Sequence, residues 1–180
     1  MVADMLDHGI DGLHYIGTPE RAAAVARSLA DRGFAGPRFL ETYLATASFL
    51  SAAGSAAEGW QVMASHIAPD AEPVRDFASA HRKRYGSAPA VWAAEAYDVT
   101  RLLIDRLTAL AAKSGRRPSR AQVTEALKKA EFKGLVTTYA FEKHGRLRTP
   151  RFHHQRVDGG RFAHVRSVSL EEYLGTKGNG

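Results

Sequence analysis

Histidine is the residue type in this chain that could most readily supply metal-binding or acid–base chemistry, and the chain has eight of them. His153 and His154 are neighbours in a predicted strand, so their side chains point to opposite faces and cannot bind one ion together. His81 lies between Phe77 and Tyr85 at helical spacing, which favours a hydrogen-bonded histidine on a helix face. None of these spacings indicates a metal site or a catalytic base, and we expect neither.

Acidic pairs and nucleophile motifs give no stronger indication of catalysis. Glu95 and Asp98 are three residues apart on a predicted helix, and we interpret them as a surface pair or a contact to Arg101. Trp92 and Tyr97 of the same helix are interpreted as core side chains. The chain has no cysteine, no G-x-x-x-x-G-K-[ST] phosphate loop, no G-x-S-x-G elbow and no H-E-x-x-H motif. We therefore expect no enzyme, no catalytic residue and no cofactor.

The composition is that of a globular protein with an excess of basic residues. Apolar residues make up 44% of the chain, and 25 Lys and Arg against 19 Asp and Glu give a formal charge of +6. The basic residues form two loose groups, at 113–120 and 146–151, without interleaved aromatic residues on which bases could stack. We expect a solvated surface and no nucleic-acid partner.

The N-terminal residues 1–8 have no basic start and no apolar run. Elsewhere, no stretch approaches the roughly 20 apolar residues that a membrane-spanning helix needs. We expect no signal peptide in this chain and no insertion into a membrane.

The elements that would position a site alternate between strand and helix in the first half of the chain. They comprise predicted strands at 12–16, 37–43 and 60–65 and predicted helices at 18–32 and 46–53. Thr18 suits a helix cap, Pro19 suits the first helical position, and Glu20 complements the positive end of the helix. Strands that alternate with helices over short turns predict an α/β fold, with a parallel sheet flanked by helices.

The second half of the chain is mostly helical before it returns to strand. It comprises predicted helices at 74–85, 90–112 and 119–130, a strand at 135–141 and a hairpin of residues 151–157 and 161–166. Ser119 and Gln122 are spaced as a capping box at the start of the third helix. Residues 175–180 are expected to form a frayed tail.

Four segments carry a resemblance to a known family. They are YIGTPE at 15–20, FLSAAGSAAEG at 49–59, the helix at 77–86 followed by AAEAYD at 93–98, and FKG at 132–134 with FEKHG at 141–145. Together they resemble the C-terminal half of the type I periplasmic solute-binding proteins, specifically the branched-chain amino-acid (leucine, isoleucine and valine) receptor-like family of ABC importers. The likeness extends from about Val2 to Arg166, and the segments 49–59 and 141–145 are its most specific parts.

The resemblance implies a two-lobed receptor that closes around its ligand. Residues 1–67 would be βα units of the C-terminal lobe, and residues 68–150 would be a helical segment and strand of the N-terminal lobe. Residues 151–180 would return to the C-terminal lobe and form the tail. The sheet of the N-terminal lobe and the first βα units of the other lobe would be missing, so the chain would be an incomplete receptor.

The resemblance also implies where a ligand would be held. One contact in the family comes from the residue between a strand and a helix, which matches Thr18, where relatives often carry a tyrosine. A second comes from an acidic residue after the next strand, where a gapless alignment puts Thr42, with Glu41 and Tyr43 on either side. We expect these four residues at the carboxyl ends of neighbouring strands, facing one cleft. In the alternative interpretation, Thr18 is only a helix cap and Glu41 only a surface carboxylate.

The implied function is that of the extracytoplasmic receptor component of an ABC importer for amino acids or similar small polar solutes, with an ABC permease as the partner of the full-length parent. Two alternatives stay open: a ligand-sensing domain of a signalling protein, and an α/β enzyme that lacks its catalytic part. An incomplete receptor would leave an unpaired sheet edge and an exposed apolar helix. The apolar side chains expected to be exposed on that helix are Val91, Ala94, Leu102, Leu103 and Leu107. We expect a homo-oligomer centred on residues 74–112, with little or no affinity for amino acids.

Overall fold

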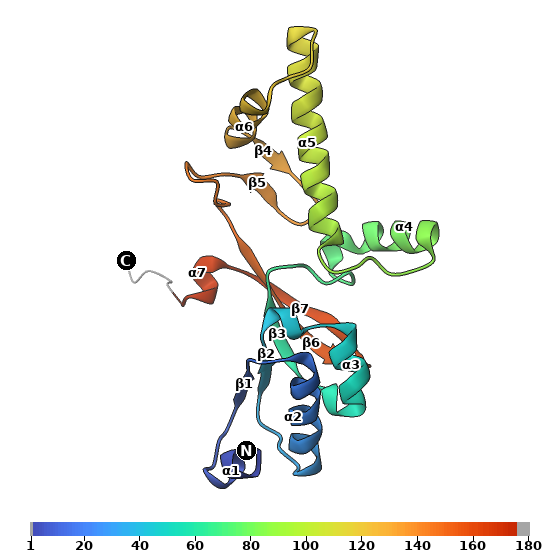
Figure 1. The fold of residues 1–180 in the computed structure, drawn as a ribbon, viewed down its shortest axis with the longest axis vertical. Helices are drawn as coiled ribbons and strands as arrows, with labels where there is room; N and C mark the ends of the chain where they lie inside the picture. The colour runs from blue at the N-terminus through green and yellow to red at the C-terminus, as the bar shows by residue number, and fades with distance from the viewer. Residues whose placement is uncertain (1, 176–180) are drawn as a thin grey trace. The chain divides into compact units, whose positions relative to one another are not determined.

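The structure is a computed structural model that describes residues 2–175, and it divides into two compact units (Figure 1). The sheet unit contains the residues up to Ala68 together with His153–Ser167. The helical unit contains Pro69–Phe152 and the residues from Val168 onward. Residues 176–180 of the expected tail lie outside the described part of the chain.

A five-stranded sheet forms the centre of the sheet unit, in the order β1-β2-β3-β6-β7. Its strands are β1 (Leu13–Tyr15), β2 (Arg38–Leu40), β3 (Gln61–Ala64), β6 (Arg151–Asp158) and β7 (Arg161–Ser169). Strands β1, β2 and β3 run parallel, and β6 is antiparallel to β3. The predicted α/β fold with three parallel strands is therefore confirmed. β1 and β7 are the two edge strands of the sheet.

Helices cover one face of this sheet. They are α1 (Val2–Asp7), α2 (Pro19–Asp31) and α3 (Ala47–Ala53), with the 3-10 turns η1 (Thr42–Leu44) and η2 (Gly54–Ala57). Small residues on α2, Ala22 and Ala26, allow close packing, and Leu29 and Phe49 are fully buried with Trp60 in the core between the helices and the sheet. Each large apolar side chain buried in this way contributes about 1.5–3 kcal/mol.

The two faces of the sheet differ because successive side chains along a strand alternate between them. The face that packs on α2 and α3 carries Leu13, Tyr15 and Leu40. The register pairs His14 with Phe39, so these two side chains project from the opposite face. This alternation explains why a polar side chain, His14, interrupts an otherwise apolar strand.

The helical unit is built around one long helix. Its elements are η3 (Glu72–Val74), α4 (Arg75–Tyr85), α5 (Ala93–Ser114), α6 (Arg120–Lys128), the hairpin of β4 (Glu131–Lys133) and β5 (Thr138–Ala140), and α7 (Leu170–Tyr173). The predicted capping box is present, because Ser119 Oγ accepts from the Gln122 amide and Gln122 Oε1 accepts from the Ser119 amide. Leu102 of α5, Ala130 and Tyr139 form the buried core of this unit.

The interpretation of Asp98 as a surface or Arg101-contacting residue is wrong. Its carboxylate is fully buried and accepts hydrogen bonds from the backbone amides of Leu135 (2.8 Å) and Val136 (2.9 Å). A methyl group on Gly134 would lie 2.6 Å from Asp98 Cγ, so only glycine lets the loop approach this carboxylate. Asp98 thus fixes the β4–β5 loop onto α5.

Two further expectations about α5 are corrected. Ala94 and Leu102 are buried in the unit and do not belong to an exposed apolar surface, because they lie on the side of the helix that carries Asp98. Trp92 and Tyr97 were interpreted as core residues, but both are exposed. Trp92 has a positive φ of 70°, which is not helical, so α5 begins one residue later, at Ala93.

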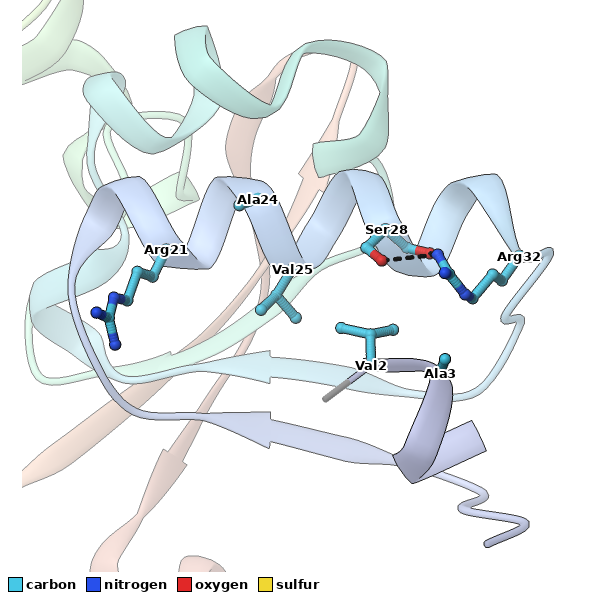
Figure 2. A pocket seen from close by; sticks show the side chains of 7 residues that line it. All are labelled: Val2, Ala3, Arg21, Ala24, Val25, Ser28 and Arg32. Atoms are coloured by element: carbon cyan, nitrogen blue, oxygen red, sulfur yellow. Dashed lines mark hydrogen bonds between the residues drawn. The ribbon is translucent and has the colours of Figure 1, made fainter. Parts of the chain in front are cut away.

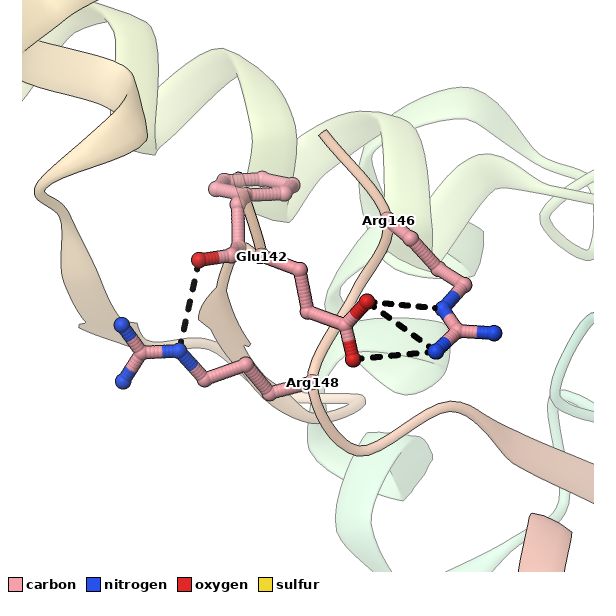
Figure 3. A network of polar contacts seen from close by, with 4 residues as sticks. Glu142, Arg146 and Arg148 are labelled. Atoms are coloured by element: carbon pink, nitrogen blue, oxygen red, sulfur yellow. Dashed lines mark hydrogen bonds and ion pairs between the residues drawn. The ribbon is translucent and has the colours of Figure 1, made fainter. Parts of the chain in front are cut away.

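The FEKHG segment forms a tight turn, which Figure 3 shows with the side chains around it. The Glu142 amide donates to the Arg146 carbonyl (2.8 Å), and Gly145 closes the turn with a φ of 83°. The Arg146 guanidinium holds the Glu142 carboxylate in a two-pronged ion pair and lowers its pKa. Arg148 Nε donates to the Phe141 carbonyl from the other side of the turn. Glu142 and Gly145 of this motif therefore both stabilise the turn.

No helix in the described part of the chain is both long enough and apolar enough to cross a bilayer.

Candidate functional site

The predicted site residues follow two neighbouring parallel strands. Tyr15 at the end of β1 is paired with Leu40 at the end of β2. The Glu41 amide donates to the Tyr15 carbonyl at 3.2 Å, which extends the pairing by one residue past β2. The segment of Gly17 and Thr18 and the segment 41–43 therefore leave the sheet side by side at its carboxyl edge, where open α/β sheets bind ligands.

Thr18 caps helix α2. Its backbone is extended and its Oγ1 accepts a weak hydrogen bond from the Arg21 amide at 3.4 Å. Its side chain is exposed and stands at the positive end of a 13-residue helix, with Pro19 in the first helical position. A hydroxyl that accepts one bond can still donate its proton, so this position offers a hydrogen bond and a favourable field to an anionic group.

Glu41 and Thr42 have different surroundings. Glu41 Oε1 lies 3.4 Å from His14 Nε2, and its side chain is 37% exposed, so the carboxylate is accessible at the sheet edge. Thr42 Oγ1 donates to the Met63 carbonyl at 3.0 Å, which ties the η1 turn to β3. The hydroxyl proton of Thr42 is thus used within the protein, whereas the Glu41 carboxylate can accept from a ligand.

Two tyrosines lie against Gly17, and only one of them was expected near a ligand. The Tyr43 hydroxyl donates to the Gly17 carbonyl at 3.1 Å. A methyl group on Gly17 would lie 2.8 Å from Tyr15 Cζ, so the Tyr15 ring lies directly over this glycine. Tyr15 was not among the predicted site residues, although its place two residues before a glycine at a strand end is visible in the sequence.

The same edge presents apolar surface. Ile16 is 67% exposed and Tyr43 is 57% exposed, although both adjoin a well-packed core. An exposed isoleucine and an exposed tyrosine ring beside a carboxylate and a helix end could contact a solute that has both charged and apolar parts. Within residues 2–175, no cluster of three or more His, Asp or Glu side chains is arranged to hold a metal ion.

A separate groove lies between α1 and α2 and has a volume of about 450 Å³ (Figure 2). Its lining is Val2, Ala3, Arg21, Ala24, Val25, Ser28 and Arg32. In Figure 2, Val2 and Val25 point toward one another across it, and Arg32 Nη1 donates to Ser28 Oγ at 2.8 Å. None of the four predicted site residues lines this groove, so it is distinct from the edge described above.

Comparisons with known proteins agree with the fold. The family model described as "Periplasmic binding protein" matches residues 1–165. A leucine binding protein from Thermotoga maritima has a similar structure, with a TM-score of 0.72 and 17% identity, over 95% of this chain and 48% of that one. A search of curated proteins found no match.

Two other solved structures are similar and contain ligands. A branched-chain amino acid transporter substrate binding protein from Streptococcus pneumoniae, in complex with isoleucine, has a TM-score of 0.73 and 16% identity, over 93% of this chain and 47% of that one. An ABC transporter solute binding protein from R. palustris, in complex with benzoate, has a TM-score of 0.66 and 18% identity, over 93% of this chain and 46% of that one.

At these identities the solved structures establish the fold alone, and the chain spans about half the length of each. The family match, in contrast, covers nearly the whole chain. The chain therefore belongs to the periplasmic binding protein family, and it has the type I fold of that family.

Proposed function

We propose that this chain supplies one side of the ligand site of an extracytoplasmic solute-binding receptor, which serves an ABC importer for amino acids or similar small polar solutes. The observation that carries the proposal is the placement of Thr18 and the Glu41–Tyr43 segment at the carboxyl ends of two neighbouring parallel strands. Family membership and the solute-binding neighbours support the same function.

Each group at this edge has a distinct role in the proposed site. The N-terminus of α2 and the Thr18 hydroxyl receive the ligand carboxylate, because both favour negative charge. The Glu41 carboxylate pairs with the ligand ammonium. Tyr43 and Ile16 contact the apolar part of the ligand. Isoleucine and benzoate, the ligands named for two structural neighbours, share a carboxylate and an apolar body, which fits this division.

The proposed mechanism is closure of two lobes on the ligand, which shifts the population toward the closed form. Residues 1–67 and 151–180 are assigned to one lobe and residues 68–150 to the other, which differs from the two compact units chiefly in that the residues from Val168 onward fall in the helical unit. Because this chain spans about half the length of the solute-binding proteins it resembles, we expect the chain alone to bind an amino acid weakly. An ABC permease is the partner of the full-length receptor, whereas the exposed side of α5 makes this chain a homo-oligomer.

The proposal is tested by titrating the ¹⁵N-labelled chain with leucine and following the backbone amides by NMR. Leucine is expected to shift the amides of Gly17, Thr18, Glu41 and Thr42 with a Kd in the millimolar range, roughly 4 kcal/mol of binding free energy. Benzoate and 4-methylpentanoate, which lacks the leucine ammonium, are titrated in parallel. We expect both to shift Thr18 and to leave Glu41 nearly unchanged.

A pair of variants separates the specific contact from general electrostatics. Glu41→Gln is expected to weaken leucine binding and to leave benzoate binding unchanged. Asp31→Asn is the matched control, because it removes an exposed carboxylate from the other end of α2. Shifts that cluster away from the ends of β1 and β2 would contradict the proposed site. Micromolar leucine binding measured by calorimetry would contradict the expectation that this chain alone binds weakly.

A further inference from the structure

The sheet unit contains a second hollow at the edge opposite the carboxyl ends of β1, β2 and β3. It lies where β2 and β3 begin and where β6 ends, and has a volume of about 540 Å³. Its polar lining comprises Arg38, Glu58, Gly59, Arg156, Asp158 and His164. None of the residues proposed to bind an amino acid lines this hollow.

Two guanidinium groups converge on one point in this hollow, at Gly59. A methyl group placed on Gly59 would lie 2.8 Å from Arg38 Nη2 and 3.6 Å from Arg156 Nη2. Gly59 has a φ of 78°, which favours glycine, and any side chain there would collide with the Arg38 guanidinium. Two cations that approach one point repel each other unless an anion lies between them.

The protein itself satisfies these guanidinium groups only in part. Arg38 donates to the Phe34 carbonyl (2.7 Å) and the Glu58 carbonyl (3.4 Å), but its Nε is buried without a hydrogen-bond partner among the described residues. Arg156 is exposed and forms no ion pair within residues 2–175.

The two carboxylates of the lining do not neutralise these arginines through contact. Glu58 Oε1 accepts from the Gly160 amide at 2.6 Å, which holds it on the β6–β7 turn. Among the described residues, no ion pair joins Glu58 or Asp158 to either guanidinium. Glu58 and Asp158 balance the two arginines in formal charge, but the three atoms nearest a methyl group on Gly59 all belong to the two guanidinium groups.

We propose that this hollow binds a small tetrahedral oxyanion of the phosphate or sulfate class between Arg38 and Arg156. A tetrahedral dianion presents oxygen atoms in several directions and can accept from two guanidinium groups at once, which suits arginine's fixed fork of donors. A planar monocarboxylate has two oxygens in one plane and a single charge. The site joins the starts of β2 and β3 to the β6–β7 hairpin, so the bound anion stabilises the sheet unit.

The test uses ¹⁵N NMR titration of the chain with inorganic phosphate, sulfate and acetate at constant ionic strength maintained with chloride. Phosphate is expected to shift the amides of Gly59, Val157 and Gly160, and sulfate to shift the same amides. Arg156→Gln should weaken phosphate binding about tenfold or more, since one charge-assisted contact is lost. Arg156 is exposed, so this variant is expected to fold.

Arg166→Gln is the matched control, because it removes one exposed arginine from the neighbouring strand without touching the hollow. It is expected to leave phosphate binding within twofold. Equal weakening by both variants would overturn the proposal, since it would indicate only the general positive charge of the chain. Acetate binding as tight as phosphate binding, or phosphate shifts that map to Thr18, would also overturn it. Arg38→Gln, with a melting curve to check its fold, should weaken phosphate binding as Arg156→Gln does.

Discussion

Single buried polar residues decide parts of this fold that sequence spacing does not reveal. Asp98 accepts from amides 37 and 38 residues further along the chain, and nothing in its own helix indicates such partners. Helical spacing predicts which side chains share a face, but not which face another segment will cover. The carboxylate was therefore misassigned to the surface, whereas the helix that carries it was predicted within a few residues.

Asp98→Ala is expected to lower the free energy of unfolding by about 3 kcal/mol or more. The change leaves two part-buried amides without acceptors, and a hydrogen bond to a charged group contributes about 1.5–3 kcal/mol. Urea denaturation measures the effect. Asp105→Ala, at an exposed position on the same helix, should change the free energy of unfolding by less than about 0.5 kcal/mol. Equal effects of the two variants would be inconsistent with a structural role for Asp98.

Two histidines with lowered pKa values, buried His66 and half-buried His154, make stability dependent on pH. Burial lowers the pKa of His66 from its ordinary value of 6.5, and burial together with the charges of Arg166 and Arg156 lowers that of His154. The unfolded chain therefore binds protons before the folded chain does as the pH falls. The free energy of unfolding is expected to be level above about pH 7.5 and to decrease as the pH drops below 6.5 toward the lowered pKa values.

Urea denaturation at pH 8, 6.5 and 5.5 checks this dependence. His66→Gln should reduce the loss of stability between pH 8 and 5.5, because it removes one of the two groups that resist protonation in the folded state. The control variant His8→Gln removes an exposed histidine and should keep the full loss. If wild-type stability is the same at all three pH values, the two histidines are not penalised for protonation in the folded chain.

At the scale of elements, the local sequence was sufficient to predict a helix boundary where capping residues mark it. Thr18, Pro19 and Glu20 define the start of α2, and the side-chain cap is present in the structure. β4 was missed because three residues, Glu131–Lys133, are too few to show a period, and its pairing with β5 depends on the loop that Asp98 holds. α7, with four residues, was missed for the same reason of length.

The start of α2 also bears on the proposed ligand site, since Thr18 has a structural and a proposed binding role. Thr18→Ala is expected to lower the free energy of unfolding by about 1 kcal/mol through loss of the helix cap. Thr18→Ser retains the hydroxyl and should stay within a few tenths of a kcal/mol of wild type, roughly as N-cap preferences indicate. Thermal unfolding of the three proteins measures this, and the same proteins can be titrated with benzoate.

The candidate site could be located from the sequence to the level of two strand ends, but not to the level of single contacts. Parallel strands meet at one edge, which brings Thr18 and residues 41–43 together without any knowledge of side chains. The orientation of Thr42 toward β3, and the approach of Tyr15 to Gly17, depend on packing between segments distant in the chain. Such contacts follow from tertiary structure, which single-chain spacing does not encode.

At the scale of the whole molecule, the chain covers about half of the three solved structures named above, and apolar side chains are exposed on α5. Tyr97 and Ile104 are two helical turns apart and share one side of the helix, and Leu107 adjoins them. Val91 and Trp92, which precede the helix, are exposed as well. Monomeric proteins rarely leave a continuous apolar surface of more than a few hundred Å² uncovered.

Self-association through this side of α5 is therefore the expected behaviour of the isolated chain. Identical chains can cover the same surface on each other by symmetric docking, which removes apolar area from water at roughly 25 cal/mol per Å². Light scattering at micromolar concentration should give a mass at least twice the 19.6 kDa of one chain.

Ile104→Glu places a charge at the centre of this surface, at a side chain that is 57% exposed in the single chain and so is not needed for folding. It is expected to shift the mass toward that of a monomer, because an unpaired buried charge is costly in an interface. Leu174→Glu, at an exposed leucine outside residues 74–112, should leave the mass unchanged. A wild-type chain that stays monomeric at micromolar concentration would contradict self-association through this side of α5.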